Sequence, residues 1–570
     1  MTRRPDRAGG PEPADAGDPG AFADAPVREV TPIPDAAAAT STATAARAGT
    51  GAQAVALGIL LSRFSGLLRD AVFSRYFGLT LQADAFRAAL RMPNVVQNLL
   101  GEGTLSASFI PVYSELQHQG RKEEAGRVAG AIFAVLLALG GLLSLIGVLA
   151  APLLVSIFLG GFDAERRALT ITATRIIFPM TGVLVLSAWS LGVLNSHRRF
   201  LLPYIAPVLW NAAMIATLVF FGGRMDLSGL TIALAWGALA GGLLQFAVQL
   251  PAVLRLDPEL RIRWNLQLQG VRTALRNAAP AVMGRGVVQL SGWLDLFLAS
   301  WLIQGAVAAI TAAQTLYLLP ISLFGMSIAA AELPELSRQR QGGMKALRDR
   351  LNRGLRQTAL FVVPTAVGYL LIGNAVVGAI YQGGRFRPSD TVFVHMLLAT
   401  YAVGLLASSS TRLYSSAFYA LHDTRTTARI ATLRVLVSGA IGAASMLALK
   451  NVVFRGHSLG ALGLAGGASV GAWLEWWLLR GRLNQRVEGR IGIPRPYLAR
   501  LGAAALVGTA TAAAFFYLLP ALHPVLRGGG ALLLYGILYF PVAAFFGVAE
   551  ARALLDRLTR RFRRQEGQGT

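Results

Sequence analysis

Long apolar runs recur along this chain and constrain its fold more than any other feature. Runs of about 20 residues, each long enough to cross about 30 Å of hydrocarbon as a helix, follow one another from about Ala52 to Ala549. The 570 residues are 54% hydrophobic and 14% charged, which leaves too little polar surface for an ordinary water-soluble protein. The runs are continuous rather than alternating, which argues against a β-barrel. The sequence therefore predicts an all-α polytopic membrane protein.

Run length and the Gly, Pro and charge punctuation between runs predict about fourteen transmembrane helices. The eighth helix repeats features of the second, because in each a mid-helix proline (Pro93, Pro320) precedes another proline (Pro111, Pro334) near the cytoplasmic end. A six-helix offset of this kind indicates two lobes of the same topology with a substrate site between them. The predicted helix centres are Leu61, Leu99, Ala138, Val183, Val208, Ala240, Leu290, Leu323, Val367, Tyr401, Ser438, Ala468, Ala510 and Gly536.

We therefore expect two six-helix lobes in a pseudo-two-fold arrangement plus two C-terminal helices. Residues 1–50 have too little bulky apolar surface to fold and are predicted to be a disordered tail. No signal-peptide core precedes Gly51, so the first helix is expected to serve as an uncleaved insertion signal. The remaining predicted segments are an N-lobe over 51–255, a C-lobe over 256–490, two helices over 491–555 and a basic tail over 556–570.

Basic residues indicate the orientation of the chain in the membrane. Alternate loops on one side hold about 28 Lys and Arg residues against about 9 on the other, and the positive-inside rule assigns the richer side to the cytoplasm. Both termini are then cytoplasmic. The net charge of +24 follows from this asymmetry and from contact with anionic lipid headgroups of the bilayer, so no nucleic-acid binding is expected.

Motifs for catalysis or metal binding are weak. The chain has no cysteine, which excludes disulfides, thiolate metal sites and cysteine catalysis. Its six histidines are scattered and form no HExxH motif, and no GxxxxGK[ST] phosphate loop occurs. Asp423 beside His422 is the best catalytic candidate, although such a pair in a basic loop is more often a solvated turn. No catalytic residue, metal site or cofactor is predicted.

Charged residues inside the first two apolar runs are the distinctive feature of the sequence. At 100° per residue, one polar stripe of about 80° forms on the second helix, and Arg63 and Asp70 share a face of the first helix beside Arg69. Charges at this depth cost from about 2.5 to more than 10 kcal/mol each, so they face one another or water. The facing stripes predict an aqueous cleft. The stripe on the second helix consists of Asp84, Arg87, Arg91, Asn94, Asn98 and Glu102.

The surplus of positive charge indicates an anionic ligand. Arg175 and Arg285 add further guanidinium groups inside other predicted helices, and a pyrophosphate or phosphate headgroup matches the Arg fork bidentately. A structural alternative stays open, in which Arg69 pairs with Asp70 or Asp84 while Arg87 and Arg91 snorkel to an interface.

These residues carry a family resemblance. The segments "SRFSGLLRD", "ADAF", "MPN", "GEGTLSASFIPVYSEL" and "LYLLPISLFG" resemble the MurJ (MviN) lipid II flippases of the MOP exporter superfamily over about residues 52–555. The resemblance implies two six-helix lobes around a cationic cavity, and two terminal helices that form a groove for a polyprenyl tail. It also implies a function in peptidoglycan biosynthesis: alternating access moves undecaprenyl-pyrophosphate-linked precursor (lipid II) from the cytoplasmic to the periplasmic leaflet of the bacterial inner membrane.

The resemblance also carries individual residues. Arg63 and Arg69 match first-helix arginines of the family, and Asp70, Asp84 and Glu102 match its nearby acids. With the residues from the helical stripe, the predicted substrate-binding cations are Arg63, Arg69, Arg87, Arg91 and Arg285, supported by Asp70, Asp84, Asn94, Asn98 and Glu102.

The chain departs from the family pattern at two cavity positions. Gln97 and Thr315 stand where arginines are expected. Arg285 is the candidate replacement for one of them, and we expect Arg285→Ala to weaken headgroup binding as much as Arg69→Ala.

The sodium site of some relatives is matched in part. Asp295 matches one ligand, but Ser438 and Gly442 stand where Asn and Asp are expected. Because hard cations need several oxygen ligands, Asp295 alone is weak support for a sodium site. Coupling to the membrane potential is the other expected energy source.

Three classes of function are compatible with the sequence: a flippase for lipid II or another polyprenyl-linked glycan, a MATE-like antiporter, and a membrane enzyme acting on polyprenyl phosphates. An antiporter for organic cations would line its cavity with acids and aromatic residues, and an enzyme would show paired catalytic groups. The surplus of arginine favours the flippase, with peptidoglycan-synthesis proteins as candidate further partners.

Overall fold

The computed structural model of this chain describes residues 48–329, 332, 336, 343–487 and 489–566, with side chains at most of these positions. Residues 1–47 of the predicted tail lie outside the described part. The first helix begins at Ala48, slightly earlier than predicted. The predicted basic tail is helical as far as Glu566 in α18 (Ala549–Glu566).

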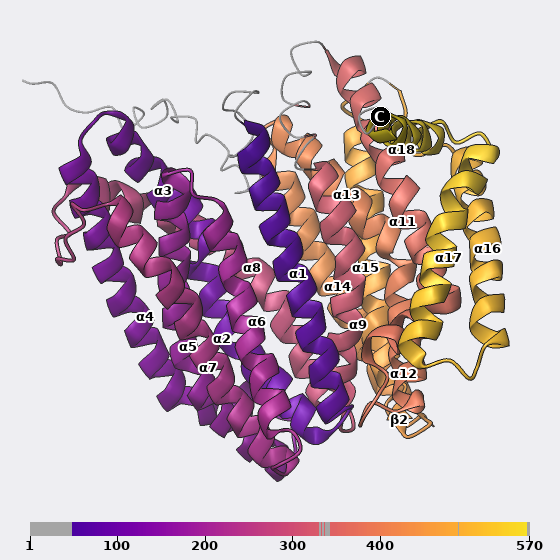
Figure 1. The fold of residues 1–570 in the computed structure, drawn as a ribbon, viewed down its shortest axis with the longest axis horizontal. Coiled ribbons are helices and arrows are strands. Elements are labelled where there is room, and N and C mark those ends of the chain that lie inside the picture. The colour runs from indigo at the N-terminus through magenta and orange to yellow at the C-terminus, as the bar shows by residue number, and fades with distance from the viewer. Residues whose placement is uncertain (1–47, 330–331, 333–335, 337–342, 488, 567–570) are drawn as a thin grey trace, which may run out of the picture. The chain divides into compact units, whose positions relative to one another are not determined.

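The described part is almost entirely helical (Figure 1). Every predicted helix centre lies inside a helical segment, which confirms the all-α class. A short antiparallel hairpin, β1 (Val453–Phe454) and β2 (His457–Ser458), turns at Arg455 and Gly456, both with positive φ. The helices before α18 are α1 (Ala48–Phe77), α2 (Leu81–Leu100), α3 (Glu102–His118), α4 (Lys122–Phe158), α5 (Ala164–Ser196), α6 (Leu201–Phe221), α7 (Leu227–Leu256), α8 (Gln269–Ser300), α9 (Ala306–Pro320), η1 (Ile321–Met326), α11 (Met344–Tyr381), α12 (Pro388–Val403), α13 (Leu405–Ala420), α14 (Thr424–Leu449), α15 (Gly460–Asn484), α16 (Arg495–Leu518) and α17 (Pro524–Phe545).

Nine described helices are long and apolar enough to span a membrane, or ten if α12 and α13, which meet at a 42° bend, form one span. This is fewer than the fourteen predicted spans because charged residues remove α1 and α2 from the apolar class. Arg63, Arg69 and Asp70 lie within α1, for example. Helices α8 and α15, which hold two further predicted spans, are also outside these nine.

Helix contacts define two groups of helices. The N-terminal helix group (α1–α7) is held by packing of α5 on α2, α4 and α7, and of α6 on α1 and α7. The C-terminal helix group (α9–α15) is held by packing of α15 on α12, α13 and α14, and of α11 on α12 and α13. Helices α16 and α17 pack on each other and on α11.

Helix α8 belongs to neither group alone. It contacts α3 and α4 of the N-terminal group and α9, α14 and α15 of the C-terminal group. A large apolar cluster also joins the two groups, with Met92 of α2 and Phe162 near the end of α4 packed among residues of α9, α11 and α12. The two helix groups therefore share a packed hydrophobic core where they meet.

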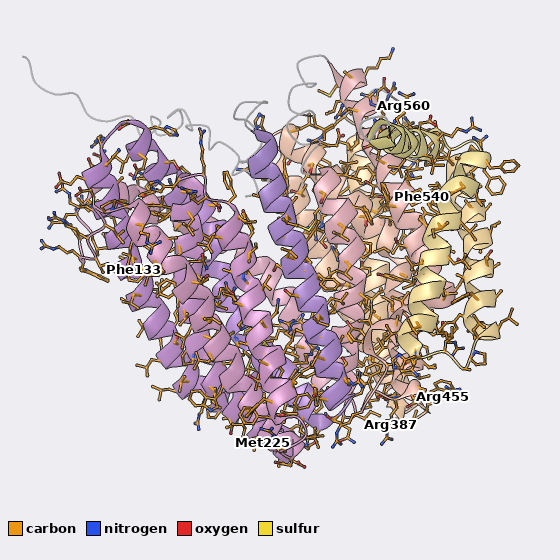
Figure 2. The ribbon with its side chains drawn as sticks, in the orientation of Figure 1. Phe133, Met225, Arg387, Arg455, Phe540 and Arg560 are labelled. Atoms are coloured by element: carbon orange, nitrogen blue, oxygen red, sulfur yellow. The ribbon has the colours of Figure 1, made fainter. Side chains whose placement is uncertain are left out.

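Aspartate caps start several helices where the chain turns at a membrane face. Asp163 accepts the backbone N–H of Arg166 at the start of α5 at 2.9 Å, and Asp226 does the same at the start of α7. Figure 2 shows Met225, Arg387 and Arg455 at the end of the helices opposite to Arg560 of α18. These loops mark the two faces between which the site is placed.

Candidate functional site

Two arginines share one aspartate inside the N-terminal helix group. Arg69 of α1 donates from Nε and Nη2 to Asp70 Oδ1, at 3.2 and 2.9 Å, and Arg87 of α2 donates from Nη1 to the same oxygen at 2.9 Å. The Arg87 and Asp70 side chains are only 8% and 5% exposed. Two guanidinium groups against one carboxylate leave this arginine cluster (Arg69, Asp70 and Arg87) with a net positive charge.

Neighbouring side chains orient the arginine cluster. Arg69 Nη1 donates to Asn211 Oδ1 of α6 at 3.0 Å, and its guanidinium carbon lies 4.9 Å from the centre of the Trp210 ring. The Arg87 guanidinium lies 4.2 Å from the Phe73 ring. Its buried Nε has no hydrogen-bond partner in the described part of the chain. Donor capacity therefore remains for an anion after the internal contacts are made.

The structural alternative for these charges predicted an ion pair for Arg69, which is confirmed, and a snorkelling Arg87, which is wrong. Arg69 pairs with Asp70, as that alternative required. Arg87 does not snorkel, because its side chain is buried against Asp70 and Phe73. The role of the cluster in binding stays a prediction.

The polar stripe on α2 grades from a buried end to an exposed end. Asp84 and Arg87 are buried, Arg91 and Asn94 are half-buried, and Asn98 is exposed. The stripe thus leads from the core between the helix groups to an open surface, as a path for a polar group requires.

Glu102 does not continue this helix, which corrects its predicted place on the stripe. Helix α2 ends at Leu100, and Glu102 starts α3. Gly101 makes the break, because a Cβ there would lie 2.4 Å from the Gln97 carbonyl oxygen. Glu102 instead has an electrostatic contact with Tyr204 of α6.

Arg91 reaches from the N-terminal helix group to α8. Its Nη2 lies 3.1 Å from where a Cβ on Gly292 would be, and it has an electrostatic contact with Asp295 one turn further along α8. Glycine at position 292 therefore provides the space that the guanidinium occupies. Arg91 therefore reaches α8, the helix that contacts both groups.

Asp84 makes the most buried polar contact between the groups. Its carboxylate is fully buried and accepts the backbone N–H groups of Gly305 at 2.6 Å and Ala308 at 2.8 Å, at the start of α9. Arg166 of α5 lies 3.6 Å away. A carboxylate at a helix N-terminus is stabilised by the unpaired N–H groups and the helix dipole. Asp84 thus fastens α2 to α9.

Main-chain contacts surround this link. The backbone N–H of Arg385, in the α11–α12 loop, donates to the carbonyl of Arg75 in α1 at 2.9 Å. A Cβ on Gly384 would lie 2.3 Å from that carbonyl oxygen, and one on Gly305 would lie 2.6 Å from the Leu79 carbonyl oxygen. Both glycines have positive φ. The two helix groups are therefore sealed together at the end that holds the α1–α2 and α11–α12 loops.

The remaining predicted site residues are less constrained. Arg63 is exposed on α1, and it makes no ion pair within the described part of the chain. The backbone of Arg285 lies in α8, but its side chain is outside the described residues, so its proposed replacement of a lost cation stays a prediction. Thr315, at a position that lacks the expected arginine, donates its hydroxyl to the Thr311 carbonyl at 2.9 Å.

Asp295 lies beside Ser438 and Gly442 of α14, the two positions that the family resemblance groups with it. Asp295, Ser438 and Gly442 line one cavity of about 60 Å³ between α8, α14 and α15. Arg434 lines the same cavity, and it was not singled out from the sequence. Its partner Glu475 was also missed. A signal was present, since Glu475 is the one acid of α15 and follows a long apolar stretch of that helix.

Asp423 and His422 form a helix start rather than a catalytic pair. Asp423 accepts the backbone N–H of Thr426 at 3.0 Å and its hydroxyl at 2.7 Å, and Arg486 donates to it at 2.5 Å. His422 is exposed with positive φ. Slight burial raises the pKa of Asp423, but these hydrogen bonds and Arg486 outweigh it and hold the pKa below its ordinary value.

We expect the stabilisation by Asp423 to depend on pH in acid. A carboxyl with a lowered folded pKa stabilises the fold above its ordinary pKa of about 4, and this stabilisation is lost as the pH falls through the lowered value. Asp423→Ala should cost about 1 kcal/mol at pH 7. Thermal unfolding of both proteins from pH 7 to pH 3 tests this. A difference between them that stays constant throughout would contradict it.

Together, a bundle of apolar helices, a net-positive buried cluster and a seal at one end define a multi-pass membrane transporter. Solved structures of such transporters share this fold. The chain matches "Lipid II flippase MurJ, inward closed conformation" with a TM-score of 0.69 at 20% identity, covering 88% of this chain and 99% of that one. It also matches an inward-facing multidrug resistance MATE transporter of the MOP superfamily with a TM-score of 0.60 at 16% identity, covering 74% and 95%.

Sequence comparison then identifies the family. The family model described as "Lipid II flippase MurJ" matches residues 73–566. A lipid II flippase MurJ of Burkholderia cenocepacia is 33% identical over 75% of this chain and 82% of its own length. A probable lipid II flippase MurJ of Rhizobium meliloti is 30% identical over 86% and 91%. The chain belongs to the MurJ lipid II flippase family, and it is a transporter rather than an enzyme.

Proposed function

We propose that this protein moves lipid II across the bacterial inner membrane, from the cytoplasmic to the periplasmic leaflet. The observation that carries the proposal is the arginine cluster, in which the buried Arg87 and the half-buried Arg69 share one carboxylate. An external anion completes the charge balance, and the pyrophosphate of lipid II offers oxygens that match guanidinium donors. Family membership supports the same substrate.

We also propose that the N-terminal and C-terminal helix groups act as the two lobes of an alternating-access transporter. The seal around Asp84 closes the end that holds the α1–α2 and α11–α12 loops. With both termini cytoplasmic, as the basic loops predict, that end faces the periplasm. The α2 stripe then accepts the headgroup from the cytoplasmic side, through Asn98, Asn94 and Arg91 toward Arg87.

The lipid tail is proposed to stay in hydrocarbon beside α16 and α17. These helices pack on α11 and expose large apolar side chains, among them Leu506, Leu533 and Ile537. Only the headgroup then has to cross, and it is the part that is costly to remove from water. The membrane potential acts on the cationic path with about 2.3 kcal/mol per charge per 100 mV.

Exposure of lipid II on the periplasmic side tests the function. In cells depleted of their own flippase, we expect the unmutated chain to restore exposure and Arg69→Ala to restore less than about a tenth of it, since one lost charge-assisted contact costs about 1.4 kcal/mol or more. Arg224→Ala is the matched control, because Arg224 also stacks on an aromatic ring, at 4.3 Å from Phe220, but lies in an exposed loop.

Equal amounts of each variant in the membrane are required for this comparison. Full activity of Arg69→Ala would exclude the arginine cluster as the headgroup site. Failure of the unmutated, well-expressed chain would instead point to another polyprenyl-linked glycan as the substrate.

A further inference from the structure

A small polar cavity lies in the C-terminal helix group, apart from the arginine cluster. Its volume of about 60 Å³ is enough for one small ion or a few water molecules. The helices around it are packed closely, since a Cβ on Gly467 would lie 2.6 Å from the Ser438 carbonyl oxygen. The cavity is lined by Asp295, Leu298, Arg434, Ser438, Gly439, Gly442, Leu464 and Ala468.

The oxygen atoms of this cavity do not suit an alkali cation. Such an ion needs several oxygen ligands, whereas the lining side chains offer the Asp295 carboxylate and the Ser438 hydroxyl. Gly442 has no side chain to contribute. A guanidinium that lines the same small space also repels a second cation.

Arg434 is held in this cavity by a buried acid. Its Nη1 donates to Glu475 Oε2 of α15 at 2.7 Å, and the Glu475 side chain is only 9% exposed. Glycine at 471 lets α15 approach α14 closely, because a Cβ there would lie 2.6 Å from Ser438 Cβ. The guanidinium is thus fixed by an ion pair on one side and by the neighbouring helix on the other.

Asp295 is the second carboxylate near this guanidinium. It has electrostatic contacts with Arg434 of α14 and with Arg91 of α2, and Tyr401 of α12 also faces it. The Tyr401 hydroxyl accepts a hydrogen bond from Gln314 at 3.1 Å. Two carboxylates and two guanidinium groups therefore balance each other without an ion from solution.

We propose that Arg434 is a built-in counter-cation that occupies the place of an alkali metal ion in this cavity. It neutralises Glu475 while Arg91 offsets the charge of Asp295, so the C-terminal helix group reaches its packed state independently of sodium. The inference bears on energy coupling in the proposed flippase and rests on that function for its role in transport. Its test measures cation binding, so the two proposals can fail separately.

The test is thermal unfolding of the purified full-length chain in sodium chloride and in choline chloride at equal ionic strength. We expect the unmutated protein to unfold at the same temperature in both salts. Arg434→Ala leaves two carboxylates facing a vacated cavity, and its midpoint should rise with sodium in a saturable manner. Arg429→Ala is the matched control, because Arg429 is exposed on the same helix.

Two outcomes would overturn the inference: a saturable, sodium-specific stabilisation of the unmutated protein, or an Arg434→Ala protein that does not respond to sodium. Arg434→Gln covers the case in which the alanine variant does not fold, because it removes the charge while much of the side-chain volume stays. It keeps both carboxylates, Asp295 and Glu475, beside a shorter uncharged side chain and should still gain sodium-dependent stability. Its insensitivity to sodium counts as the second of these outcomes.

Discussion

Asp70→Asn is expected to destabilise the protein by about 3 to 5 kcal/mol, the cost of breaking a buried ion pair from one side. The substitution removes the carboxylate shared by Arg69 and Arg87 and leaves a buried and a half-buried guanidinium group without it. Thermal or denaturant unfolding in detergent, followed by tryptophan fluorescence, measures the change.

Two comparisons isolate the charge effect in this experiment. Asp226→Asn is the matched control, because Asp226 caps α7 in an exposed loop and asparagine caps helices equally well. Asp70→Asn combined with Arg87→Met removes one surplus cation and should recover a large part of the loss. Equal unfolding of Asp70→Asn and Asp226→Asn would mean that Asp70 does not compensate the arginines.

Asp84→Ala is expected to release the seal between the helix groups and to abolish flipping. The variant leaves the backbone N–H groups of Gly305 and Ala308 and the nearby Arg166 without the carboxylate that they share. A lost coupling of 1 to 3 kcal/mol shifts a conformational equilibrium by about 5- to 150-fold. The sealed state is then no longer dominant, which stalls the cycle.

Cysteine labelling measures this opening without background, because the chain has no native cysteine. Leu79→Cys, at the seal, should react with a membrane-impermeant maleimide at least about tenfold faster when Asp84→Ala is present, following the same coupling energy. Asp163→Ala is the control, since Asp163 caps α5 and pairs with Arg166 without touching α9. Unchanged labelling with retained flipping would exclude Asp84 as the fastening group.

Local features of the sequence predicted the fold well. A run of about 20 apolar residues has few alternatives to a helix in a bilayer, which explains why every predicted centre lies in a helix. In the sequence, Gly101 appears only as a glycine that interrupts the second apolar run. Whether it bends one helix or starts another depends on the extended backbone of Gly101 (φ −80°, ψ −151°), which helical periodicity does not contain.

The partners of the site residues could not be predicted from the sequence, because they lie far away along the chain. Asp84 lies on the predicted stripe, but its partners Gly305 and Ala308 are backbone groups more than 200 positions away. Arg69 donates a hydrogen bond to Asn211 on a different helix, and the local sequence pattern does not single out that asparagine. The pairing of Arg434 with Glu475 likewise became apparent only from the packing of α14 on α15.

The glycine contacts at the seal have a consequence for the energy balance of the cell. A carrier for a bulky headgroup needs a wide passage, and a wide passage could conduct protons or ions and discharge the membrane. Here Gly384 and Gly305 bring main chain against main chain, at distances that leave no room even for a Cβ. A file of water cannot thread such a contact. We therefore expect the closed end to act as electrical insulation, and an alanine in place of either glycine to strain the seal and to let ions leak through it.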